Sequence, residues 1–71
     1  MEEYSRIVIE EYCMTHRSKR RDYIWYLLGL SYSLEALPTD EDALFLEKAI
    51  KNEKTSELKE ALQDLDDYLF F

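Results

Sequence analysis

The residues of this chain with the greatest nucleophilic potential are Cys13 and His16, each the only residue of its type. They lie three positions apart, so a helix would place them on one face, where a histidine can activate a thiolate. A cysteine nucleophile also needs an orienting residue and a site that stabilises the oxyanion, and the sequence offers neither. We therefore interpret Cys13 as a small buried apolar residue and His16 as a surface residue. We predict no catalytic residue and no enzyme activity.

Two acidic clusters could in principle bind a cation, one at residues 40–42 and one formed by Asp64, Asp66 and Asp67. Neither has the central glycine and terminal glutamate of a calcium loop, and no group has zinc spacing. The first cluster fits the acidic first turn of a helix. The second fits a solvated helix face, with a contact surface for a basic partner as the alternative. We predict no metal site and no cofactor.

A basic cluster in the first third of the chain could contact the phosphates of a nucleic acid. Tyr23 and Trp25 follow it and could stack on bases. The net charge of −7 opposes such binding, which depends on Lys and Arg meeting phosphate. The simpler interpretation is that this basic patch pairs with an acidic patch on another subunit. Its members are Arg17, Lys19, Arg20 and Arg21.

An acidic patch follows one stripe near the end of the chain, at the spacing of successive helical turns. Residues 38–71 hold ten acidic residues against four basic ones, so this half supplies the counterpart for the basic patch. The alternative is that the acidic half imitates DNA and occupies a DNA-binding protein. Lys54 and Lys59 interrupt that acidic surface. The acidic patch comprises Glu57, Glu60, Asp64 and Asp67.

One glycine and one proline in 71 residues leave little room for tight β-turns, and long periodic segments favour helix. A short strand at residues 6–9 is the rival interpretation, because Ile7, Val8 and Ile9 are β-branched. Short connections imply antiparallel neighbours. The sequence thus predicts a single all-α domain over residues 1–71, a small bundle of three to four antiparallel helices at about 2–16, 23–37, 40–51 and 56–69.

Charges and caps set the predicted helix boundaries. Cations are favourable at a helix C-terminus, so the basic patch is expected to end the first helix, with Asp22 as the N-cap of the second. Thr39 follows the only proline and is a strong N-cap for the third helix. Asp42, three residues on, stands where a capping box has its acid.

The segment 23–37 is too apolar for a chain of this size to bury easily. Positions 23, 27, 30, 34 and 37 form one helical stripe, and further apolar side chains lie beside it. Gly29 in the middle is expected to allow the close approach of a neighbouring helix. The surplus apolar surface predicts contact with another protein molecule. The predicted partner or oligomer interface is Tyr23, Trp25, Tyr26, Leu27, Leu30, Leu34, Phe45, Phe70 and Phe71.

The size of the chain also favours association. A domain of about 60 residues buries roughly 60% of its unfolded surface, so its stability is marginal without a disulfide, a metal or a partner. With a single cysteine no intrachain disulfide forms, which fits a reducing compartment. The acidic start Met1-Glu2-Glu3 predicts no signal peptide, and the apolar run is too short to span a membrane. We therefore expect a cytoplasmic protein.

Residues 45–54, Phe45-Leu46-Glu47-Lys48-Ala49-Ile50-Lys51-Asn52-Glu53-Lys54, precede Leu58-Lys59-Glu60-Ala61-Leu62. This stretch resembles the IDEAL-motif helical hairpin of small Bacillus-type proteins. Leu46, Ala49 and Ile50 match its apolar positions, whereas Glu47 and Lys48 stand where the motif has Asp and Glu. The resemblance implies a protein-interaction element without catalysis.

These features together predict a small non-enzymatic interaction module of bacterial or phage type. We expect a homo-oligomer, most simply a homodimer, that regulates or inhibits another protein. The alternative is a nucleic-acid-related protein, acting either through the basic patch or as a DNA mimic.

Overall fold

The protein is an all-α bundle of four helices, seen in a computed structural model that describes residues 1–33 and 36–70. No strand occurs among these residues, so the predicted fold class is confirmed and the strand at residues 6–9 is wrong. The helices are α1 (Glu3–Thr15), α2 (Lys19–Leu30), α3 (Asp40–Asn52) and α4 (Ser56–Phe70).

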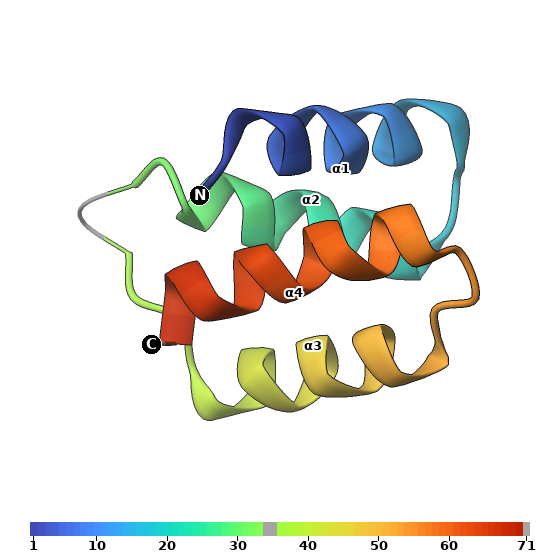
Figure 1. Ribbon diagram of the computed structural model, residues 1–71. Helices are drawn as coiled ribbons and strands as arrows, with labels where there is room; N and C mark the ends of the chain where they lie inside the picture. The colour runs from blue at the N-terminus through green and yellow to red at the C-terminus, as the bar shows by residue number, and fades with distance from the viewer. Residues whose placement is uncertain (34–35, 71) are drawn as a thin grey trace.

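The helices alternate in direction, so α1 and α3 begin at the end of the bundle where α2 and α4 finish (Figure 1). The helix α4 packs against both α1 and α3, and α1 also packs against α2. This up-and-down arrangement matches short connections between antiparallel neighbours. The core between the helices takes a fully buried side chain from each of them: Ile9, Ile24, Leu27, Leu46, Leu62 and Leu65.

The predicted boundaries of the second helix are wrong at both ends. The helix begins at Lys19, with Ser18 rather than Asp22 as its N-cap, because the Ser18 hydroxyl accepts a hydrogen bond from the backbone N–H of Arg21. It ends at Leu30, so the predicted helical stripe does not reach Leu37, which is 83% exposed outside any helix. Leu34 of that stripe lies outside the described residues.

The basic patch therefore begins α2 instead of ending α1, against the preference of the helix dipole. Side-chain contacts offset this cost. The Arg21 guanidinium donates to the carbonyl oxygen of His16, at 2.9 Å, and lies 3.1 Å from the carboxylate of Asp22. Arg20 donates to the Tyr12 hydroxyl at 2.7 Å and to the Glu53 carboxylate at 2.8 Å, which joins three helices near one end of the bundle.

Replacing Arg20 with Met is expected to lower the free energy of unfolding by about 2 kcal/mol, because hydrogen bonds to charged groups contribute about 1.5–3 kcal/mol each and Arg20 is partly exposed. The change leaves Glu53 without its cation. Urea titration of both proteins measures the loss. The control is Arg6→Met, which removes only surface ion pairs to Glu3 and Glu10 and should cost less than about 1 kcal/mol. Equal losses for the two variants would contradict a linking role for Arg20.

The start of α3 has the predicted capping box. The Thr39 hydroxyl accepts from the backbone N–H of Asp42 at 3.2 Å, and the Asp42 carboxylate accepts from the backbone N–H of Thr39 at 2.9 Å. The other oxygen of this buried carboxylate accepts the hydroxyl of Tyr23, at 2.5 Å. Burial alone would raise the pKa of Asp42, but the hydrogen bonds from Tyr23 and Thr39 hold it below its ordinary value. The box thus ties α2 to α3.

No other helix of this chain packs against Gly29. It is exposed in the last turn of α2, and a β-carbon added there would meet nothing within 4 Å. No residue of the described chain has a positive φ, so Gly29 is not required for an unusual backbone conformation either. The expected close approach within the chain is wrong.

Candidate interaction surface

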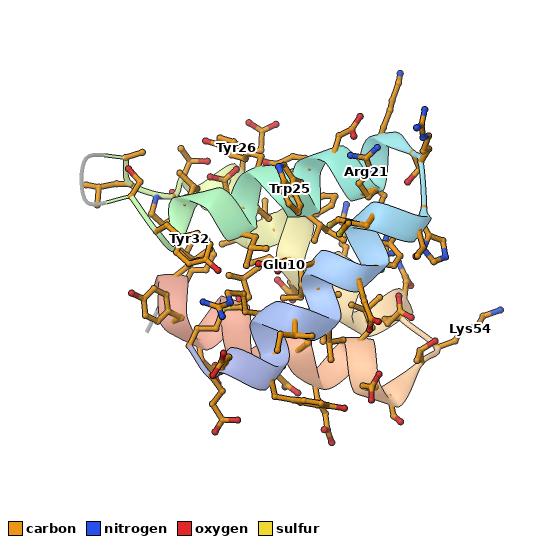
Figure 2. The ribbon with its side chains drawn as sticks, turned by 90° about the horizontal axis from the view of Figure 1, so that it is seen from above. Glu10, Arg21, Trp25, Tyr26, Tyr32 and Lys54 are labelled. Carbon is orange, nitrogen blue, oxygen red and sulfur yellow. The ribbon has the colours of Figure 1, made fainter. Side chains whose placement is uncertain are left out.

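The outer side of α2 carries two adjacent exposed aromatic residues, and a third lies in the turn after the helix. Trp25 is 49% exposed and Tyr26 52% exposed, and Tyr32, in the turn after the helix, is 57% exposed. Helical spacing places Asp22, Trp25, Tyr26 and Gly29 on one side of α2. Figure 2 shows Trp25 on the flank of α2 that faces α1 and Tyr26 on the opposite flank. We call Asp22, Trp25, Tyr26, Gly29 and Tyr32 the aromatic face.

The aromatic face continues toward α3 through two ring contacts. The rings of Tyr26 and Tyr23 meet edge to face with centroids 6.0 Å apart, and Tyr23 stacks on Phe45 of α3 at 4.1 Å. The hydrogen bond to Asp42 raises the pKa of Tyr23 to about 12, so its hydroxyl stays protonated. The exposed ring of Tyr26 is therefore held in place by Tyr23, which in turn packs on Phe45.

At the other end of the aromatic face, Tyr32 borders a shallow cleft of about 410 Å³. The cleft brings together the start of α1, the end of α2 and the last turns of α4. Its other lining residues are Met1, Glu3, Arg6, Ser31 and Tyr68. Tyr68 is itself more than half exposed. The exposed aromatic surface thus extends beyond α2 in two directions.

The structure separates the predicted interface residues into three groups. Leu27 and Leu30 are buried in the core of the single chain, so they are wrong as interface residues. They face inward because the buried side of α2, which packs on the bundle, consists of Ile24, Leu27, Leu28 and Leu30. Tyr23, Phe45 and Phe70 are partly buried against the core, and Trp25 and Tyr26 are exposed. Leu34 and Phe71 lie outside the described residues.

Three residues of the aromatic face were not among the predicted interface residues, namely Asp22, Gly29 and Tyr32. Their spacing from Trp25 and Tyr26 would have placed them on the same side of a helix. The sequence could not reveal that this side is the exposed one, because segment 23–37 is apolar nearly all round. Which side faces outward depends on the neighbouring helices.

The four residues of the basic patch do not form one open surface. Arg20 and Arg21 are partly buried and make the hydrogen bonds described above. Arg17 and Lys19 are exposed, and their side chains make no hydrogen bond or ion pair with the described residues. Two rather than four cations are therefore available to a partner.

The acidic patch runs along α4 beside α1. Glu57 accepts the hydroxyl of Tyr4, and this hydrogen bond raises the pKa of Tyr4. Asp64 accepts the backbone N–H of Glu2 at 3.0 Å. Two carboxylates of the patch thus fasten the start of α1 to α4. Glu60 and Asp67 are exposed.

Cys13 is buried and His16 is exposed, as predicted. Burial raises the pKa of the Cys13 thiol to about 11, so the nucleophilic thiolate is scarce at neutral pH. The His16 ring stacks on Tyr12 with centroids 4.5 Å apart, and its Nδ1 lies 3.1 Å from the carbonyl oxygen of Tyr12. The two side chains are thus engaged with different neighbours.

In the described part of the chain, no three His, Cys, Asp or Glu side chains are grouped so that they could hold a metal ion. Over the same residues, none of the helices has the length and apolar character needed to cross a membrane. Comparisons of the chain with protein-family models, with curated proteins and with solved structures gave no match. The aromatic face on α2, with Trp25 and Tyr26 about half exposed, is the candidate site.

Proposed function

We propose that this chain is a small non-enzymatic protein-interaction module, which self-associates and regulates or inhibits another protein. The observation that carries this proposal is the aromatic face of α2. Trp and Tyr are the residues that most often dominate binding energy at protein interfaces, because each buries a large rigid surface at a small cost in conformational entropy. The single buried cysteine is in keeping with a reducing compartment such as the cytoplasm.

The composition of the aromatic face distinguishes it from the outer side of α3, whereas the outer side of α1 also exposes Tyr4, Ile7 and Met14. The exposed side of a surface helix is normally polar or charged, and 35% of this chain is charged. On the outer side of α3, Leu44 stands among Glu41, Glu47 and Lys48, as expected for a solvated face. The aromatic face has Asp22 as its only charged member, and Lys19 borders it beside Asp22 and Tyr26. Depletion of charge around exposed aromatic rings is typical of the centre of an interface.

Changing both Trp25 and Tyr26 to Ala is expected to abolish self-association at concentrations where the unchanged chain associates. The loss of two such side chains at the centre of an interface costs about 2 kcal/mol or more each, which raises the dissociation constant more than about a hundredfold. Sedimentation velocity at a series of concentrations measures the change.

The matched control is Leu44→Ala, which removes an equally exposed apolar side chain from the outer side of α3. It should leave the mass in solution unchanged. Circular dichroism should report the same helical content for all three proteins, because neither Trp25 nor Tyr26 is in the core. An oligomer that survives the double change would refute the assignment of the aromatic face.

A further inference from the structure

A groove lies between the start of α2 and the later part of α3, two helices that do not pack closely on one another. The closely packed pairs are α1 with α2, α1 with α4 and α3 with α4. The groove has a volume of about 380 Å³. We call it the α2–α3 groove, and its defining residues are Lys19 and Tyr23 of α2 and Phe45, Lys48, Ala49 and Asn52 of α3.

The floor of the α2–α3 groove is apolar and held in place. The rings of Tyr23 and Phe45 stack with their centroids 4.1 Å apart and their planes 6° from parallel. The Tyr23 hydroxyl donates to Asp42, which fixes this ring from its other end. Ala49 lies one helical turn after Phe45, and its small side chain leaves the space beside the rings open. Because the rings are already ordered, an apolar side chain that packs on them loses little additional conformational entropy from the groove.

Cations border this floor from both helices. Lys19 lies one turn before Tyr23 on α2, Lys48 lies on α3, and Arg20 also lines the groove. Arg20 is already bonded to Glu53. Lys19 and Lys48 are exposed, and neither forms an ion pair with a described residue. Two unpaired positive charges therefore flank an apolar floor.

The helices themselves supply no partner for these two lysines. The positions three and four residues from Lys48 hold no acidic residue. Asp22, three residues after Lys19, lies instead 3.1 Å from Arg21. The charge of each lysine is thus left for solvent or for a partner molecule.

The sign of the charge in the groove is opposite to that of the whole chain, whose net charge is −7. No carboxylate of the described residues lines the α2–α3 groove. A second hollow, between α1 and α4, shows the contrast, because its charged lining residues are all acidic: Glu2, Glu57, Glu60 and Asp64. The groove therefore combines an apolar floor with a local positive potential on an acidic protein.

We propose that the α2–α3 groove docks a short acidic segment of another protein. An aromatic or aliphatic side chain of the segment packs on the rings of Tyr23 and Phe45, and its carboxylates lie at Lys19 and Lys48. The unpaired cations attract and orient such a segment, while the apolar floor supplies contact area. The inference rests on the proposed regulation of another protein and names the chemistry of that partner.

This docking site is separate from the aromatic face, because neither Trp25 nor Tyr26 lines the groove. A nucleic acid fits the groove less well than an acidic protein segment. Its phosphates repeat at every nucleotide, and binding depends on several free cations, whereas the groove offers two on a chain of net charge −7. One or two carboxylates next to an apolar side chain match what the groove presents.

Selection from short random peptides displayed on phage tests the partner chemistry, because such a library favours no composition in advance. We expect the selected peptides to be rich in Asp and Glu next to Phe, Trp or Leu. The same peptides, synthesised with a fluorescent label, should bind the double variant Lys19→Glu, Lys48→Glu at least about tenfold more weakly in fluorescence anisotropy, since attraction becomes repulsion on both sides of the groove.

The matched control is the double variant Lys54→Glu, Lys59→Glu. It changes the net charge by the same amount at two exposed residues that do not line the groove. It should weaken binding less than about threefold, because charges outside the groove act only through screened long-range repulsion. Circular dichroism should show the same helical content for both double variants, since all four lysines are exposed.

Several results would overturn the docking proposal. One is a selection that gives no binding peptide, or peptides without an excess of acidic residues. Another is equal binding of the selected peptides to the two double variants. Binding of an oligothymidylate that is lost in Lys48→Glu would assign the groove to nucleic acid instead. A lower mass of Lys48→Glu in light scattering would assign it to a second copy of this chain.

Self-association is judged separately with the variant that changes Trp25 and Tyr26 to Ala. This variant should still bind the selected peptides, because its groove residues are unchanged; loss of peptide binding would place the peptides on the aromatic face and overturn docking in the groove. If the unchanged chain is a monomer that binds the peptides through Lys19 and Lys48, self-association is overturned and docking stands. If the chain associates but selects no peptide, docking is overturned and self-association stands.

Discussion

Replacing Leu27 with Ala is expected to lower the free energy of unfolding by about 3 kcal/mol. Leu27 is fully buried between the helices, and Leu→Ala changes at such sites cost about 2–5 kcal/mol from lost burial and from the cavity that remains. Small domains have a total stability of about 5–15 kcal/mol, and this one should be near the lower bound. Urea denaturation followed by circular dichroism measures the loss.

The contrast with Trp25 makes this experiment informative. Trp25→Ala removes a side chain that is half exposed on the same helix, so it should lower the stability of the dilute monomer by less than about 1 kcal/mol. Leu27→Ala and Trp25→Ala together thus separate the core side of α2 from the interface side. A stable Leu27→Ala protein that fails to associate would mean that the side of α2 assigned to the core is the interface.

Replacing Asp42 with Ala is expected to lower the free energy of unfolding by about 3 kcal/mol, measured by urea denaturation. The change removes a capping box, whose loss costs about 1 kcal/mol, and leaves the Tyr23 hydroxyl and the Thr39 N–H without their acceptor, at about 1–3 kcal/mol. The matched control is Asp40→Ala in the same turn, because Asp40 is exposed and makes no side-chain hydrogen bond among the described residues. Asp40→Ala should lower the free energy of unfolding by less than about 1 kcal/mol, because only a favourable interaction with the helix dipole is lost.

The Asp42 contribution should also depend on pH. The pKa of Asp42 in the folded chain is below its unfolded value, so its ionised form stabilises the fold. That stabilisation is complete above the ordinary value of about 3.9 and is lost as the pH falls through the lower folded-state pKa. The stability gap between the unchanged chain and Asp42→Ala should therefore narrow below about pH 4. A gap that stays constant down to pH 2 would contradict the hydrogen-bond assignment.

The sequence predicted the third and fourth helices closely because their signals are local. Thr39 and Asp42 lie three residues apart, and the capping box they form needs no other part of the chain. The start of the second helix was mispredicted because a distant contact outweighs a local preference and because the local cap at Ser18 was missed. Cations at a helix start are unfavourable, but Arg20 bonds to Glu53, 33 residues away, and Ser18 supplies the cap.

The candidate site was only partly predictable for a related reason. Trp25 and Tyr26 were identified because segment 23–37 has more apolar surface than a small domain can bury. Leu27 and Gly29 were assigned to the wrong environments, because a helix that is apolar nearly all round does not reveal which side faces the core. That choice depends on how α1, α3 and α4 pack, which periodicity alone does not encode.

Light scattering of the unchanged chain across a concentration series, with the fluorescence of Trp25 recorded on the same samples, tests the central claim most directly. Trp25 is the only tryptophan, so its emission reports on the aromatic face alone. We expect the mass to rise to twice that of one chain, with a blue shift of the emission over the same concentrations as Trp25 leaves water. A mass of one chain at every concentration, with Trp25 emission unchanged, would contradict self-association through the aromatic face.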